Sequence, residues 1–157
     1  MNIRHAANAD RERIREILIA TGRFSRQEVG WAMELVDSAL AHPERNDYEA
    51  HVLAEEQAIH GYVLFGPTPM TDGVYDLYWI AVDPQQQGKG FGQVLLRFVE
   101  NEVRRRAGRM LLIETSSKRS YAPTIRFYRQ AGYHEISRIK DFYRIEDDKV
   151  VFCKHLA

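Results

Sequence analysis

Cysteine is almost absent from this chain of 157 residues, in which Cys153 is the only one. A lone cysteine cannot form an intramolecular disulfide, so the fold has to be stable without one. We expect Cys153 to be a small buried residue of the last strand, since free cysteine is among the most buried residue types. A nucleophilic thiol is the alternative, because His155 follows two residues later and would share its strand face.

Long apolar runs and an excess of charge are missing as well. No stretch approaches the ~20 apolar residues of a membrane span, and the chain begins without a signal-peptide core. The 22 basic and 22 acidic side chains leave a formal net charge of +0, whereas nucleic-acid-binding domains carry a basic stripe. We therefore expect a soluble, cytoplasmic protein with no membrane or nucleic-acid partner.

Metal-ligand spacing is also absent. The other histidines are scattered along the chain, at His5, His42, His51, His60 and His134. Zinc sites in sequence are typically marked by closely spaced pairs of ligands. We therefore expect no metal site.

Regular hydrophobic patterns fill the whole chain, without repeats, linkers or low-complexity segments. The length suits one domain covering residues 1–157. Asn8 is expected to cap the first helix, and Ser25 with Glu28 has the spacing of a capping box at the second. Strands are expected at 2–6, 48–56, 58–66, 74–82, 109–115, 133–145 and 149–156, and helices at 8–21, 25–41, 91–107 and 121–131.

The middle of the chain reads as strand, helix, strand, which implies a right-handed crossover and a parallel strand pair. The other strands follow one another through short turns, including a final hairpin around residues 146–148. These patterns predict an α+β fold. Its central mixed, mostly antiparallel sheet has about seven strands with one parallel β-α-β crossover, flanked by about four helices.

Between that strand and that helix lies the stretch VDPQQQGKGFG, residues 82–92. A glycine turn that opens a helix directs several free N–H groups at one point, and the helix dipole adds positive potential there. Lys89 could screen further negative charge. The spacing matches neither a Walker loop nor a dinucleotide-binding fingerprint, because Phe91 follows Gly90 and Gln93 stands where a third glycine is needed. The turn therefore suits a phosphate, with a purely structural turn as the alternative.

Two motifs resemble a known family. The pattern Gln85-x-x-Gly88-x-Gly90, between a strand and an amphipathic helix, resembles the acetyl-CoA loop of the GNAT N-acetyltransferases. Downstream, PTIRFYRQAGY (residues 123–133) resembles the helix of that family that ends in F-Y-x-x-x-G-F/Y. The order of strands and helices also agrees over nearly the whole chain. The resemblance implies a GNAT fold with acetyl-CoA as cosubstrate and no metal.

The resemblance also implies which residues bind the cofactor. Loop amides would bind the pyrophosphate of coenzyme A, and the backbone of the preceding strand would pair with the pantetheine arm as if it were another strand. Tyr121 stands where many members have a cofactor-contacting asparagine, so that contact is left out of the expected site. The implied residues are Ile80, Ala81, Val82, Gln87, Gly88, Lys89, Gly90, Phe91 and Gly92.

Three residues are candidates for the chemistry. Tyr128 matches the family's tyrosine that protonates the coenzyme A sulfur, and a phenol can supply that proton at neutral pH. Its alternative role is core packing. For the general base, Asp76 occupies the strand position used by the glutamate of histone-type members, where a regular strand would place it on one face with Tyr78, Ile80 and Val82. Glu114 is the rival, and either carboxylate could instead be merely solvated.

The sequence therefore predicts an N-acetyltransferase that transfers acetyl from acetyl-CoA to a primary amine in a ternary complex. A non-catalytic acyl-CoA-binding or sensing module on the same fold is the alternative. The acceptor could be an amino acid, a polyamine, an antibiotic, a peptide terminus or a lysine. Nothing in the sequence decides between a monomer and a homodimer.

Overall fold

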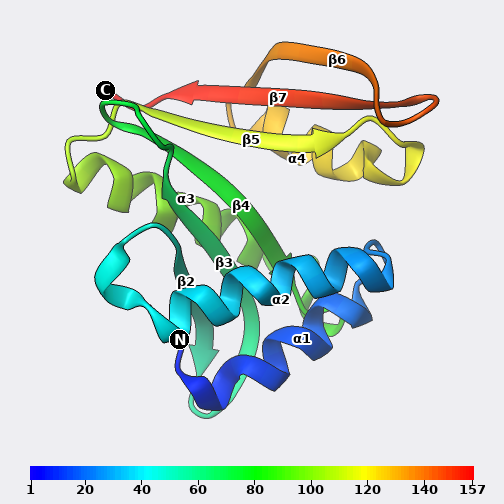
Figure 1. Ribbon diagram of the computed structural model, residues 1–157. Helices are drawn as coiled ribbons and strands as arrows, with labels where there is room; N and C mark the ends of the chain where they lie inside the picture. Colours follow the sequence, from blue (N-terminus) through cyan, green and yellow to red (C-terminus); the bar gives the residue numbers. More distant parts are fainter.

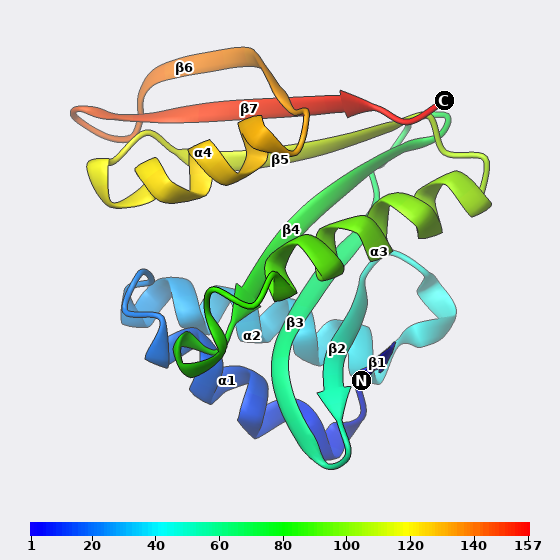
Figure 2. The same cartoon turned by 180° about the vertical axis from the view of Figure 1, so that it is seen from behind.

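The computed structural model describes residues 1–157 as a curved seven-stranded sheet with helices on both faces (Figures 1 and 2). The strands are β1 (Asn2–His5), β2 (Glu49–Glu55), β3 (Ala58–Pro67), β4 (Val74–Val82), β5 (Met110–Ser116), β6 (His134–Arg144) and β7 (Asp147–His155). The helices are α1 (Arg11–Ala20), α2 (Arg26–Ala41), α3 (Phe91–Arg105) and α4 (Ala122–Gln130). None of them is long and apolar enough to cross a membrane.

The strands lie in the order β1-β2-β3-β4-β5-β7-β6. Only β4 and β5 run parallel, joined through α3, and every other pair is antiparallel. The predicted mixed sheet with one crossover is therefore confirmed.

Two hydrophobic cores hold the helices against the sheet. On one face, α3 and α4 pack with Leu53, Val63, Phe65 and Phe152. On the other face, α1 and α2 pack with Val52, Tyr62, Leu64 and Ala81. Figure 2 shows α3 and α4 in front of the sheet, whereas Figure 1 shows α1 and α2 in front of it.

Helix starts bear out one prediction and correct another. At α2, Ser25 Oγ accepts a hydrogen bond from the Glu28 N–H at 3.1 Å, and Glu28 reaches back to the Ser25 N–H, as the capping box predicts. The prediction of Asn8 as the first cap was wrong. A short 3-10 turn precedes α1, and the Asp10 carboxylate accepts the Ala7 N–H at 2.7 Å. Arg4 holds the Asp10 carboxylate through a bidentate ion pair, and α1 itself begins without a side-chain cap.

Strand β4 contains a bulge that moves the side chains before it to the other face. The pairing with β3 jumps from Leu64↔Trp79 to Phe65↔Leu77, which leaves Tyr78 as an extra residue. Ile80 and Val82 consequently pack toward α3, while Tyr78 and Trp79 pack toward α1 and α2. The expectation that Asp76 shares a face with Ile80 and Val82 was therefore wrong, because period-two alternation fails at a bulge.

Directly at this bulge, β4 and β5 separate. Their parallel pairing covers only Val74–Leu77 against Met110–Ile113. Beyond these residues the two strands diverge, as Figure 1 shows for the green and yellow strands. The edge of β4 from Tyr78 to Val82 that faces β5 is left without a strand partner.

Cys153 lies in β7 opposite Leu112, is buried, and has a pKa raised by burial. The raised pKa keeps the thiol protonated. Cys153 is therefore a core residue, as expected, and His155 at the strand end is exposed.

Candidate functional site

A cavity of about 830 Å³ opens where β4 and β5 diverge. Its walls come from the segment between α1 and α2, from β4 and β5, from the turn before α3, from α4 and from the β6–β7 hairpin. We call the part around residues 87–93 the loop end, and the part around Asp76 and Tyr143 the hairpin end. A cavity of this size, between elements of both cores, is typical of a small-molecule site.

The loop end presents unpaired main-chain donors. None of the backbone N–H groups of residues 88–93 donates a hydrogen bond within the protein. Gly88 (φ 81°) and Gly90 (φ 79°) have left-handed backbones, and a Cβ atom at either would meet no atom within 4 Å. Both glycines line the cavity, so their missing side chains leave the donors accessible there. This end is suited to an anion at the N-terminus of α3.

Asp83 fixes the turn that leads into the loop end. It is 7% exposed, accepts the Gln85 N–H at 3.0 Å, and forms an ion pair with Arg13 of α1. Lys89, in contrast, does not line the cavity, and its Nζ donates to Gln86 Oε1 at 2.7 Å. The main chain therefore supplies most of the positive potential at this end.

Tyr128, on α4, is 4% exposed and lies at the border between the cavity and the core. Its ring packs against those of Phe127, Tyr133 and Phe152. Burial raises the pKa of its hydroxyl, and no hydrogen bond opposes this shift. The phenol therefore keeps its proton at neutral pH, and its ring serves the core as well.

Asp76 lies in β4 directly before the bulge and is half-buried in the cavity wall. Its Oδ2 accepts a hydrogen bond from Thr68 Oγ1 at 2.7 Å and faces the Tyr78 hydroxyl at 3.4 Å. Burial raises the pKa of this carboxyl, and the negative charge of Glu114 adds to the rise. The result is a carboxylate that accepts a proton more readily than an exposed aspartate does.

Glu114 lines the same cavity from β5 but is exposed, and its Oε1 lies 3.3 Å from Lys149 Nζ. The structure therefore brings both candidate carboxylates to one place, in different surroundings.

Aromatic side chains surround this region, and of these the sequence reasoning gave only Tyr128 a role in the site. Arg23 Nη1 donates to Thr124 Oγ1 at 3.1 Å, which joins the segment before α2 to α4 across the cavity. Tyr121, also in the wall, has a pKa raised to about 12 by burial. The aromatic lining residues outside the loop end are Phe24, Trp31, Tyr78, Trp79, Tyr121, Phe127, Tyr128 and Tyr143. Only their assembly from distant segments identifies them as a group.

The β6–β7 hairpin reaches the cavity through an irregular stretch of β6. From Ile139 to Arg144 this strand advances five residues, while β7 advances two, from Lys149 to Asp147. The extra residues include Asp141, whose left-handed backbone (φ 53°) is unfavourable for a residue other than glycine. Tyr143 lies within this bulge and Arg144 ends it, and both line the cavity. Bulges next to functional sites commonly redirect side chains in this way.

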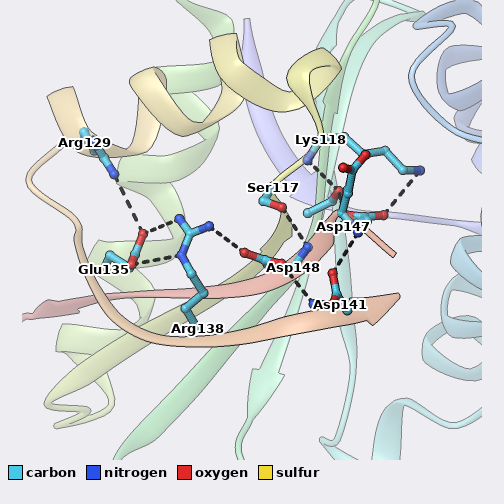
Figure 3. A network of polar contacts seen from close by, with 10 residues as sticks. Ser117, Lys118, Arg129, Glu135, Arg138, Asp141, Asp147 and Asp148 are labelled. Carbon is cyan, nitrogen blue, oxygen red and sulfur yellow. Dashed lines mark hydrogen bonds and ion pairs between the residues drawn. The ribbon is translucent and has the colours of Figure 1, made fainter. Parts of the chain in front are cut away.

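A network centred on Asp148 holds this bulge in place (Figure 3). Its carboxylate accepts the Asp141 N–H at 3.0 Å and pairs with Arg138 at 3.0 Å. Its main chain exchanges hydrogen bonds with Ser117, at 2.7 Å and 3.0 Å. Arg138 in turn binds Glu135. The network thus ties the hairpin to the segment that follows β5.

The neighbouring Asp147 lines the cavity and is 3% exposed. It accepts a hydrogen bond from Ser116 and lies 3.6 Å from Lys118 Nζ. Its charge is therefore compensated within the protein.

Comparisons with known proteins agree with this geometry. The model of the acetyltransferase (GNAT) domain matches residues 46–135. A crystal structure of a protein from Desulfovibrio desulfuricans, assigned to the GNAT family of acetyltransferases, has 41% sequence identity and a TM-score of 0.95, with 99% of each chain covered. No curated protein sequence gives a significant match.

More distant solved structures share the fold. An acetyltransferase from Salmonella typhimurium, solved with its cofactor acetyl-CoA, is 21% identical with a TM-score of 0.75, over 100% of this chain and 94% of that one. The ribosomal-protein-alanine N-acetyltransferase from Brucella melitensis is 20% identical with a TM-score of 0.75, over 99% of both chains.

Proposed function

Because the chain belongs to the GNAT family of acetyltransferases, we propose that it transfers the acetyl group of acetyl-CoA directly to a primary amine while both are bound. The observation that carries this proposal is that one cavity contains groups suited to binding acetyl-CoA and groups suited to transferring protons. Unpaired N–H donors, an open strand edge, a protonated tyrosine and a half-buried carboxylate all line it.

The residues present fit acetyl-CoA. The N–H groups of residues 88–93 match a pyrophosphate, and the glycines leave room for it. The unpaired edge of β4 at Ile80–Val82 matches the amide groups of an extended pantetheine arm. The proposed binding residues are thus those expected from the sequence, with Lys89 outside the wall. When bound, acetyl-CoA supplies an activated acetyl thioester.

Tyr128 is the proposed general acid. A phenol is protonated at neutral pH, so the hydroxyl carries a proton that it can donate to a leaving thiolate. Burial raises the pKa of this hydroxyl, which makes it a weaker acid than an exposed tyrosine. Because the ring is fixed between Phe127 and Phe152, the hydroxyl is held in place before the reaction.

Asp76 is the proposed general base. Deprotonating a lysine-type amine at pH 7 costs about 4.6 kcal/mol, against about 1 kcal/mol for an α-amine. The raised pKa of Asp76 makes its carboxylate the better proton acceptor, and Thr68 orients it. Glu114 is exposed and paired with Lys149, which favours Asp76 over this rival.

The hairpin end is where the amine is expected to enter, since Asp76 and Glu114 lie there among aromatic side chains. Aromatic faces and carboxylates favour a cationic group. A structural neighbour is named for acting on an alanine of a ribosomal protein, so α-amines belong in any screen of acceptors.

Two measurements test the proposal together. Calorimetry with acetyl-CoA, ATP and NAD should show binding of acetyl-CoA alone. An amine panel of amino acids, polyamines, aminoglycosides and peptides should then reveal acetyl-CoA-dependent thiol release. Equal affinity for all three ligands, or none for acetyl-CoA, would refute the cofactor assignment. Binding without thiol release from any amine would instead support an acyl-CoA sensor.

A further inference from the structure

Outside the cavity, strand pairing brings two histidines together on the sheet face that α3 covers. The register of β1 against β2 places His5 opposite His51, with their ring centroids 4.2 Å apart. Spacing along the chain could not reveal this pair, because only the antiparallel register joins them. Neighbours across an antiparallel pair have Cβ atoms close enough to share a ligand.

His51 is the inner member of the pair. It is 4% exposed, and its ring lies between those of Phe65 and Phe98. Its Nδ1 atom is buried and has no hydrogen-bond partner. Buried polar atoms are nearly always satisfied, so an unpaired imidazole nitrogen calls for an explanation.

Glu49 completes a set of three donors. It precedes His51 by two residues on the same strand and therefore points to the same face. One ligand atom from each of His5, Glu49 and His51 lies within 4.8 Å of the other two. Glu49 also pairs with Arg106, directly after α3, and Arg106 has a second partner in Glu102 at 3.2 Å. Arg106 can thus remain paired if Glu49 turns toward a ligand.

The ligand atoms of His5, His51 and Glu49 favour one class of metal ion. A neutral imidazole with an unpaired ring nitrogen, such as Nδ1 of His51, offers a lone pair, as metal binding requires. Imidazole nitrogens with one carboxylate suit Zn²⁺, Ni²⁺ or Cu²⁺ and do not suit Mg²⁺, which prefers oxygen ligands.

We propose that His5, His51 and Glu49 bind a divalent transition metal ion, which fastens β1 to β2 at the edge of the sheet. His5 is exposed and gives the ion a path to the site. With three protein ligands, a tetrahedral Zn²⁺ would keep one position for water. The site lies apart from the proposed acetyl transfer and does not depend on it.

The test uses the full chain after treatment with a chelator. Calorimetry with ZnCl₂ should show one equivalent bound, and CoCl₂ should give the visible absorption of a tetrahedral Co²⁺ site. His5→Gln and His51→Phe each remove one ligand, and phenylalanine fits the aromatic surroundings of His51. His134→Gln, which changes an isolated exposed histidine of β6, is the matched control.

Zinc affinity should fall at least about tenfold in His5→Gln and His51→Phe and stay unchanged in His134→Gln. Zinc should also slow hydrogen exchange at the β1 amides of the wild-type chain, whereas MgCl₂ should not. Because His5 is exposed, His5→Gln keeps the test valid even if His51→Phe misfolds. The proposal is overturned if wild-type protein binds no zinc, or if His5→Gln binds it as tightly as wild type.

Discussion

The two ends of the cavity differ in the groups that they present, which are main-chain groups at the loop end and side chains at the hairpin end. The loop end is one continuous segment whose main-chain N–H groups are the binding groups. The hairpin end is assembled from side chains of β4, β5 and the β6–β7 hairpin, which are far apart in sequence. Main-chain recognition needs only a glycine pattern in the right place, whereas side-chain recognition needs the whole fold. The loop end should therefore tolerate side-chain changes that the hairpin end does not.

Tyr128→Phe should produce the largest effect, because Tyr128 is the proposed general acid. The substitution keeps the ring and its packing but removes the proton donor. Positioned acid catalysis is typically worth about 10²–10⁴-fold, and we expect a loss of turnover near the lower limit, since a thiolate is a fairly good leaving group. Steady-state kinetics and acetyl-CoA calorimetry check this. Near-normal turnover in the folded variant would assign Tyr128 to core packing alone.

Asp76→Asn should have the next largest effect on turnover, about 10- to 100-fold at neutral pH, at or below the lower limit of the range typical of general acid–base catalysis. Acetyl-CoA affinity should not change, and the loss should shrink at high pH as the amine loses its proton unaided. Glu114→Gln should have a smaller effect in the same assay. The reverse order of the two variants would give the role of base to Glu114.

Asp76→Asn is expected to lower turnover but to raise stability relative to wild type as the pH increases. The folded-state pKa of Asp76 is raised by burial, so the carboxyl stabilises the fold while it is protonated. This contribution is lost as the pH rises through the folded-state pKa. An asparagine at position 76 does not titrate. The unfolding free energy of Asp76→Asn should therefore increase relative to that of wild type as the pH is raised from acid to neutral. Urea unfolding at several pH values measures this; a constant difference would contradict it.

Gly90→Val tests the loop end. Gly90 has a left-handed backbone, and a branched side chain would both strain it and project into the cavity. We expect acetyl-CoA affinity to fall by about tenfold, which corresponds to about 1.4 kcal/mol. Gly22→Val is the matched control, because Gly22 also has a positive φ (66°) and open space but does not line the cavity. Equal losses of affinity in both variants would indicate a general effect on the fold.

Asp148→Asn should have the smallest effect, confined to the hairpin end. It weakens the pairing with Arg138 that fixes the bulge containing Tyr143. We expect the KM for the amine to rise by about threefold to tenfold, or about 0.7–1.4 kcal/mol, with acetyl-CoA affinity unchanged. Glu135→Gln, which weakens the outer ion pairs of Arg138 and Arg129 but leaves Asp148 in place, is the control. A matching change in acetyl-CoA affinity would show that the two ends are not independent.

The sequence allowed prediction of the features that depend on local patterns. The strand and helix order, the parallel crossover and the glycine turn follow from periodicity and spacing. The bulge at Tyr78 was not predictable, because the residues of this strand are nearly all apolar and show no alternation that a bulge would interrupt. The wall around Tyr143 and the pair of His5 with His51 depend on strand register, which no local pattern specifies.

The strand order also constrains how the sheet is completed during folding. Strand β7 lies between β5 and β6, and β6 has no other neighbour in the sheet. Strand β6 can therefore join the sheet only through β7. Every residue of β6 is exposed even in the finished sheet, including the apolar side chains Ile136, Ile139 and Phe142. In a folding intermediate in which β7 has not yet paired, β6 would be a free apolar strand through which two chains can associate.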